Sequence, residues 1–179
     1  MGKFSRRTTA LALALLPLLS TGRGAGAQPS APMSGRTLAA AGPVALAAET
    51  TRVPLVPGAG AVGLRQQLAG LGQELFLVLD DLQASEQPGI IYEIYLGLPP
   101  GAAPATDDRH FVGTLNFFAV APPNTSRRSR SYNVTALIPS LLSQGLSDDN
   151  LAVTIVGRVQ SQPPAAVHPT VGSIALVAQ

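Results

Sequence analysis

Cysteine is absent from the 179-residue chain, and histidine occurs only twice, at His110 and His168. Without thiols the protein cannot form disulfide bonds, bind zinc through thiolates or use a cysteine nucleophile. A binuclear copper centre needs about six imidazole ligands, so this chain alone cannot build one. An exported form of the protein must therefore be held together by its hydrophobic core.

Positive charge is also scarce beyond the N-terminus. Residues 1–27 contain four basic residues and no acidic one, so their removal leaves eight basic against ten acidic residues, a net charge of about −2. Nucleic acids and anionic membranes require a basic face that neutralises phosphates. The composition therefore argues against a nucleic-acid partner. The short basic cluster of Arg127, Arg128 and Arg130 is expected to be a solvated loop.

The first 27 residues have the order of a secretory signal peptide. Basic residues at Lys3, Arg6 and Arg7 precede the apolar run 10–19, and small residues ending at Ala27 form a cleavage pattern. The apolar run is about half of the ~20 residues that cross a bilayer, so no membrane span is expected in the mature chain. We expect export to the periplasm or the cell exterior, with cleavage near Ala27.

The export route is left open by the sequence. Adjacent Arg6 and Arg7 favour the twin-arginine route. Thr9 and Ala10 stand where that motif usually has a bulky apolar pair. The alanine-rich, lysine-poor composition is typical of a bacterial protein.

Residues 28–50 are rich in Ala, Gly and Pro without a sustained period, which predicts a flexible linker. The rest, 51–179, has the size of one domain. It consists mainly of short β-rich runs separated by turn residues, a pattern that predicts an antiparallel β-sandwich. The expected strands are 52–56, at an edge because of its proline, then 74–79, 90–96, 110–120, 131–134, 151–159 and 171–177. One short helix is expected at 136–144, capped by Thr135.

Within 90–96, alternate residues share a face. Tyr92 lies on the face with Ile90, whereas Glu93 and Tyr95 lie on the other. We expect Glu93 on the sheet surface rather than buried, because glutamate is seldom buried.

Few residues could support catalysis. Asp107, Asp108 and His110 form a polar cluster, but adjacent residues of a strand cannot both point at one ion. We expect them to form a loop leading into a strand. The formal dinucleotide motif at 58–63 lacks a strand–helix unit, and no serine elbow occurs. We therefore assign no catalytic, cofactor or metal-binding residue, and a hydrolase built on this cluster is the weakest alternative.

Several segments, in order, resemble the domain that follows the copper-binding domain in tyrosinases and polyphenol oxidases. The matching segments are 75–80, 88–99, 110–118, 132–135 and 151–156. Y-E-I-Y-L-G-L-P followed by H-F-V-G-T-L is the most specific part. The resemblance covers about residues 50–179 and implies a jelly-roll-like sandwich. The histidine-bearing helical domain is missing, so no copper ligand or oxidase activity carries over.

In that family the domain packs beside the copper domain and can shield its entrance. The resemblance therefore implies a non-catalytic module that docks on or shields a separate tyrosinase-like copper oxidase. A side chain plugged into the partner's site is conceivable for Tyr92 or Tyr95, although we expect both to pack in the sheet. The alternative is an exported surface or matrix domain that binds protein or polysaccharide through loops. The candidate partner contacts are Tyr92, Tyr95, Asp107, Asp108, His110, Arg127, Arg128 and Arg130.

Overall fold

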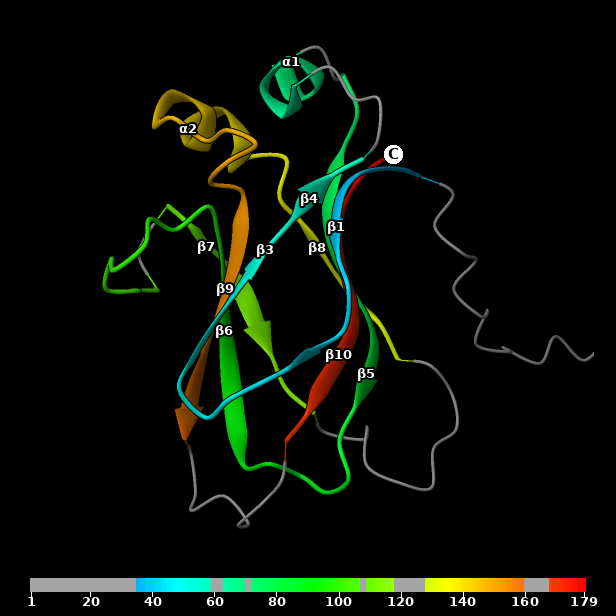
Figure 1. The fold of residues 1–179 in the computed structure, drawn as a ribbon, viewed down its shortest axis with the longest axis vertical. Helices are drawn as coiled ribbons and strands as arrows, with labels where there is room; N and C mark the ends of the chain where they lie inside the picture. Colours follow the sequence, from blue (N-terminus) through cyan, green and yellow to red (C-terminus); the bar gives the residue numbers. More distant parts are fainter. Residues whose placement is uncertain (1–34, 59–62, 70–71, 107–108, 118–127, 160–167) are drawn as a thin grey trace, which may run out of the picture. The chain divides into compact units, whose positions relative to one another are not determined.

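The computed structural model describes residues 35–58, 63–69, 72–106, 109–117, 128–159 and 168–179. In these ranges the chain forms two antiparallel β-sheets packed as a sandwich, with two short helices (Figure 1). The predicted all-β sandwich is confirmed.

The first sheet, sheet A, has the strand order β4-β1-β10-β5-β8, and β2 also pairs with β10. Its described strands are β1 (Arg36–Ala41), β2 (Val44–Ala45), β4 (Val56–Pro57), β5 (Leu75–Gln83), β8 (Arg130–Asn133) and β10 (Thr170–Ala178). The strand predicted from the apolar run 74–79 is β5, which lies between β10 and β8.

The second sheet, sheet B, has the strand order β3-β9-β6-β7. Its described strands are β3 (Thr50–Pro54), β6 (Ile90–Leu96), β7 (Phe111–Leu115) and β9 (Ala152–Val159). Pro54 lies in β3 at the sheet edge, as predicted, because proline has no N–H to donate to a second neighbour.

The pairing of these strands is nested. β1 pairs with β10, β3 with β9, β5 with β8, and β6 with β7, each pair lying inside the previous one along the chain. Apart from the short β2 and β4, the described strands number eight and lie in two sheets of four. This is the arrangement of a jelly roll.

The core lies between the sheets and follows the alternation of the strands. In β5, Leu75, Leu77 and Leu79 point inward and are buried. In β6, Tyr92 and Ile94 point inward together with Ile90 and Leu96, as predicted. Full burial of each such aliphatic side chain contributes about 1.5–3 kcal/mol, which is how a chain without disulfides holds its sheets together.

Tyr132 of β8 joins the two sheets along one edge. Its hydroxyl donates to the backbone oxygen of Thr114 in β7, at 2.7 Å. Its ring lies where a side chain at Gly113 would sit, since a Cβ there would be 3.0 Å from the ring carbons. The glycine therefore permits the close approach of the Tyr132 ring.

Part of the predicted linker is a strand. Within 28–50, the described residues 35–50 include β1, which pairs with β10 and buries Leu38 and Ala39 in the core. The prediction of a flexible linker through residue 50 is wrong for this part. The alanines of β1 show no alternation in hydropathy, and their burial does not alternate either: Ala39 is buried, and Ala40 and Ala41 are both partly buried.

The two helices are α1 (Leu64–Ala69) and α2 (Ile138–Ser143), which contact each other at one end of the sandwich (Figure 1). The predicted helix at 136–144 is confirmed as the shorter α2, but Thr135 does not cap it. The Thr135 hydroxyl instead accepts the backbone N–H of Leu75, at 2.8 Å, and so ties the segment before α2 to β5.

Candidate functional site

The loop between β6 and β7 is anchored at both ends by backbone hydrogen bonds. Leu96 N–H donates to His110 O at 2.9 Å, and Gly97 N–H donates to Ala152 O at 2.8 Å. Gly97 has a φ of 65°, which favours glycine, and a Cβ there would lie only 2.8 Å from Leu146 Cδ1. The sequence thus turns sharply at Gly97 and brings the start of the loop beside the segment after α2.

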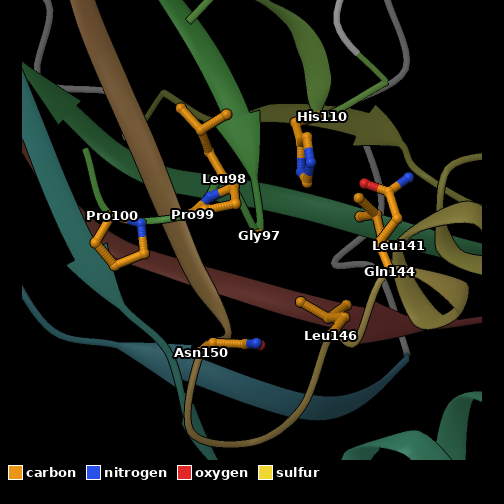
Figure 2. Close-up of a pocket in the computed structure, with 9 residues that line it drawn as sticks. All are labelled: Gly97, Leu98, Pro99, Pro100, His110, Leu141, Gln144, Leu146 and Asn150. Carbon is orange, nitrogen blue, oxygen red and sulfur yellow. The ribbon is translucent and has the colours of Figure 1, made fainter. Parts of the chain in front are cut away.

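This turn forms one wall of a cavity of about 110 Å³. Figure 2 shows Leu98, Pro99 and Pro100 on one side of it and His110 and Gln144 on the other. Among the described residues, the lining consists of Gly97, Leu98, Pro99, Pro100, His110, Leu141, Gln144, Leu146 and Asn150. The cavity therefore combines aliphatic walls with three side chains that can form hydrogen bonds.

His110 is buried, with 7% of its surface exposed, and its Nδ1 lies 2.9 Å from Leu96 O. Together with the backbone bond from Leu96 N–H to His110 O, this contact holds the ring against the end of β6. His110 therefore lines the cavity, and the contact of its Nδ1 with Leu96 O fixes the position of its ring.

The far wall of the cavity is held by Asn150. Its amide Nδ2 donates to Gly145 O at 2.9 Å, and its Oδ1 accepts the Ser147 N–H at 2.8 Å. Leu146 N–H donates to Leu141 O at 3.0 Å. These bonds shape the turn after α2 before any ligand is present, so the cavity is preformed.

Tyr95 lies on the opposite face of sheet B from the core, in a second apolar cluster. It packs with Leu98 and Val156, and its ring meets that of Phe111 edge-on at 5.5 Å. Arg52 donates a hydrogen bond to Leu98 O from the edge strand. The start of the β6–β7 loop therefore covers this outer cluster.

Glu93 sits beside Tyr95, and one of its oxygens accepts two hydrogen bonds and forms an ion pair. Tyr95 Oη, Arg158 Nε and an Arg158 terminal nitrogen each lie 2.9 Å from Glu93 Oε2. The Glu93 side chain is only 12% exposed, so the expectation of a sheet-surface glutamate is wrong. Arg158 supplies the positive charge that makes this burial tolerable.

Burial is also the main influence on the titration of Tyr95. It raises the pKa of Tyr95 to about 12, and the hydrogen bond to Glu93 adds to the effect because a phenolate beside a carboxylate is disfavoured. The same contacts with Glu93 raise the pKa of Arg158. Glu93, Arg158 and Tyr95 therefore form one structural cluster on the outer face of sheet B.

Tyr92 is buried in the main core and its ring meets Phe117 edge-on at 5.8 Å. Its hydroxyl has no hydrogen-bond partner among the described residues. Burial raises the pKa of Tyr92 to about 12. Both candidate tyrosines are thus completely buried, as expected from packing, and neither is presented to a partner.

The remaining candidate contacts lie apart from the cavity or outside the described ranges. Arg130 is exposed at the start of β8. Arg128 is partly buried, and within the described segments its Nε is buried without a hydrogen-bond partner. Asp107, Asp108 and Arg127 lie outside the described residues. Among the predicted contacts that the structure describes, only His110 lines the cavity.

The donor set does not fit copper. Two histidines are too few for a binuclear site, and His168 is exposed whereas His110 is held against β6. Across the described ranges, no three His, Asp or Glu side chains gather closely enough to hold a metal ion.

In the same part of the chain, no helix has the length and apolar character to cross a membrane.

Comparison with known proteins gives one family and a group of solved structures. A family model described as "Domain of unknown function (DUF7868)" matches residues 39–179. No curated protein matches the chain.

Among solved structures, latent apple tyrosinase is similar at 17% identity and a TM-score of 0.46, over 76% of this chain and 27% of that chain. Recombinant latent aurone synthase, a polyphenol oxidase, is similar at 15% identity and a TM-score of 0.43, over 76% of this chain and 25% of that chain. The chain thus spans about a quarter of these structures. Both solved structures are of the tyrosinase and polyphenol oxidase type that the sequence resembles.

Proposed function

The chain belongs to the family described as "Domain of unknown function (DUF7868)", and from this premise we propose that it is an exported, non-catalytic module that docks on a separately folded copper oxidase of the tyrosinase type. In this role it shields the oxidase or assists its assembly. The protein contributes binding surface, and the partner contributes the copper chemistry.

The proposal depends on one observation: the segments with the most specific sequence resemblance form β6, β7 and part of the cavity lining. The segments 90–99 and 110–115 form β6 and β7, which pair directly. Gly97, Leu98, Pro99 and His110 from these segments also line the preformed cavity. The residues that resemble the oxidase-associated domain therefore build a concave surface feature, which suits a contact role.

A contact role also agrees with the use of polar side chains around β6. Glu93, Tyr95 and Arg158 are engaged with one another, and His110 is engaged with Leu96. A general base must be within hydrogen-bond reach of a substrate proton. The bonds of Glu93 and His110 instead connect parts of the fold.

Complex formation tests the proposal directly. We expect the mature protein, mixed with a tyrosinase-type copper oxidase from its own host, to co-elute from a size-exclusion column and to lower the rate of diphenol oxidation. Ovalbumin at the same concentration is the control for nonspecific effects. Separate elution together with unchanged oxidation at micromolar concentrations would contradict the proposal.

Export is part of the same proposal and rests on the basic, apolar and small-residue order of residues 1–27. We expect the protein recovered from its host to begin at Gln28. Intact-mass measurement checks this. A cell-associated protein that keeps residues 1–27 would contradict export by this signal.

A further inference from the structure

We propose that the mature protein resists o-quinones, the electrophiles that a phenol-oxidising partner releases, because it presents few of the groups that these compounds attack. This inference rests on the proposed docking function and names the chemistry that the protein must withstand in that position. An oxidase that acts on an o-diphenol removes two electrons and two protons from it, and dioxygen, the oxidant, is reduced to water. The product is an o-quinone, which leaves the oxidase beside any protein docked there.

An o-quinone modifies a protein by forming a covalent bond to a nucleophilic side chain. The nucleophile forms a C–S or C–N bond to a ring carbon. Its proton and the hydrogen of that carbon move to the two ring oxygens, so that the adduct is a substituted diphenol. Thiolates and neutral amines are strong nucleophiles of this kind. The chain has no cysteine, and its single lysine is Lys3, within the residues 1–27 that export removes. Neither a thiol nor a lysine amine therefore remains in the mature protein.

Arginine supplies the positive charge of the mature protein. All eight basic residues of positions 28–179 are arginines. A guanidinium group stays protonated in proteins and offers no free electron pair, whereas a lysine amine can lose its proton and react. Arg158 uses its charge to pair with Glu93, and Arg130 is exposed at the start of β8. The charges that the fold and its surface require are therefore present without a reactive amine.

The two imidazoles differ in their exposure. His110 is buried, and its Nδ1 lies 2.9 Å from Leu96 O. His168 is exposed. An imidazole nitrogen reacts only where the quinone can reach it. His168 is therefore the one imidazole at which we expect addition.

The tyrosines, which carry the phenol group that such an oxidase acts on, are also withheld. The chain has three tyrosines, and the structure describes all of them. Tyr92 and Tyr95 are completely buried, and the Tyr95 hydroxyl donates to Glu93. Tyr132 is partly buried, and its hydroxyl donates to Thr114 O at 2.7 Å. Because a copper site must reach the phenol oxygen, the folded protein is a poor substrate for the oxidase that it accompanies.

A chemically prepared quinone tests the proposal in the absence of any oxidase. The mature chain, residues 28–179, is mixed with 4-methyl-o-benzoquinone at neutral pH, and its intact mass is followed with time. We expect adducts only at the α-amino group and at His168, and His168→Ala should remove the second of these. Peptide mapping locates each adduct.

A matched pair of variants tests the role of arginine at one exposed position. Arg130→Lys adds an amine and should gain one further adduct. Arg130→Gln removes the same charge but adds no nucleophile, so it should react like the unmodified sequence. The thermal unfolding midpoint of each variant shows that it is folded.

A soluble tyrosinase tests the protection of the tyrosines. The folded mature protein should remain unoxidised, whereas the peptides released from it by trypsin should react. At each oxidised tyrosine the ring gains one oxygen atom of dioxygen and loses two hydrogen atoms, which leave with the other oxygen atom as water. Mass spectrometry detects this change.

The proposal would be overturned if the mature chain gained as many adducts as Arg130→Lys, or if Tyr92, Tyr95 or Tyr132 were oxidised in the folded protein. The quinone titration contains no oxidase, so its failure is distinguishable from a failure of the docking function. A protein that resists the quinone but forms no complex with the oxidase would contradict the docking function alone.

Discussion

The hydroxyl groups of the three tyrosines lie in three different environments. The Tyr92 hydroxyl is buried without a partner among the described residues, and that of Tyr95 donates to a carboxylate. The hydroxyl of Tyr132 donates to a backbone oxygen across the two sheets. Identical side chains therefore contribute differently to stability, according to what each hydroxyl contacts.

We expect Tyr92→Phe and Tyr95→Phe to have opposite effects. Removing a buried hydroxyl without a partner removes its desolvation cost, so Tyr92→Phe should raise the free energy of unfolding by about 1 kcal/mol. Tyr95→Phe loses the hydrogen bond to Glu93 and should lower it by about 1 kcal/mol. Urea denaturation measures both. A loss of stability in Tyr92→Phe would show that its hydroxyl has a partner.

The titration of the tyrosines should be coupled to unfolding. All three have a raised pKa, about 12 for Tyr92 and Tyr95, chiefly because of burial, against an ordinary value of 10.0. A folded pKa above the unfolded one means that the folded state retains more protons. The contribution of these tyrosines to the free energy of unfolding is therefore fully present below pH 10 and is lost as the pH rises toward about 12.

Absorbance of tyrosinate and circular dichroism, recorded together against pH, check this prediction. We expect tyrosinate to appear only as the sheet signal is lost. A phenolate that forms near pH 10 while the circular dichroism spectrum stays unchanged would contradict the burial of these side chains.

The face on which Glu93 lies could be predicted from the sequence, but its ion pair could not. Alternation correctly placed it on the face of β6 opposite Tyr92. The sequence could not show that Arg158, 65 positions later, would pair with it. Pairing across strands is decided by register, which the sequence of one strand does not specify.

At the scale of elements, alternation predicted most strands because each has one face in the core. Alternation missed β1, because the alanines of this strand show no hydrophobic contrast. The predicted capping role of Thr135 was also wrong, because its hydroxyl accepts the backbone N–H of Leu75 instead. The cavity could not be predicted at all. Its walls come from Gly97–Pro100, His110, Leu141–Leu146 and Asn150, which only the folded chain brings together.

Gly157 of β9 is required by the close approach of another segment. Its N–H donates to Glu49 O at 2.7 Å, and a Cβ at this position would collide with the backbone oxygen of Ala48. Gly157→Ala should therefore lower the free energy of unfolding by about 1–3 kcal/mol, through overpacking against backbone. Urea denaturation provides the measurement.

Gly42→Ala is the matched control, since nothing lies within 4 Å of a Cβ at residue 42. It should change stability by less than about 0.5 kcal/mol. Equal effects of the two substitutions would contradict the described packing of the 48–49 segment on β9.

At the scale of the whole molecule, the nested pairing makes the fold depend on its first strand. β1 lies between β4 and β10 and contributes Leu38 and Ala39 to the core. A chain that begins at Gly42 lacks this strand and should lose at least about 3 kcal/mol relative to a chain that begins at Gly35. Thermal unfolding of the two chains compares them. Equal midpoints would show that β1 is dispensable.

The position of β10 has a consequence for biosynthesis. This strand is the last described in the sequence, yet it lies inside sheet A, between β1 and β5. While the ribosome still holds residues 170–178, β1 and β5 have no shared neighbour, and the sheet has a gap at its middle. The nascent polypeptide therefore remains loose until residues 170–178 have left the ribosome.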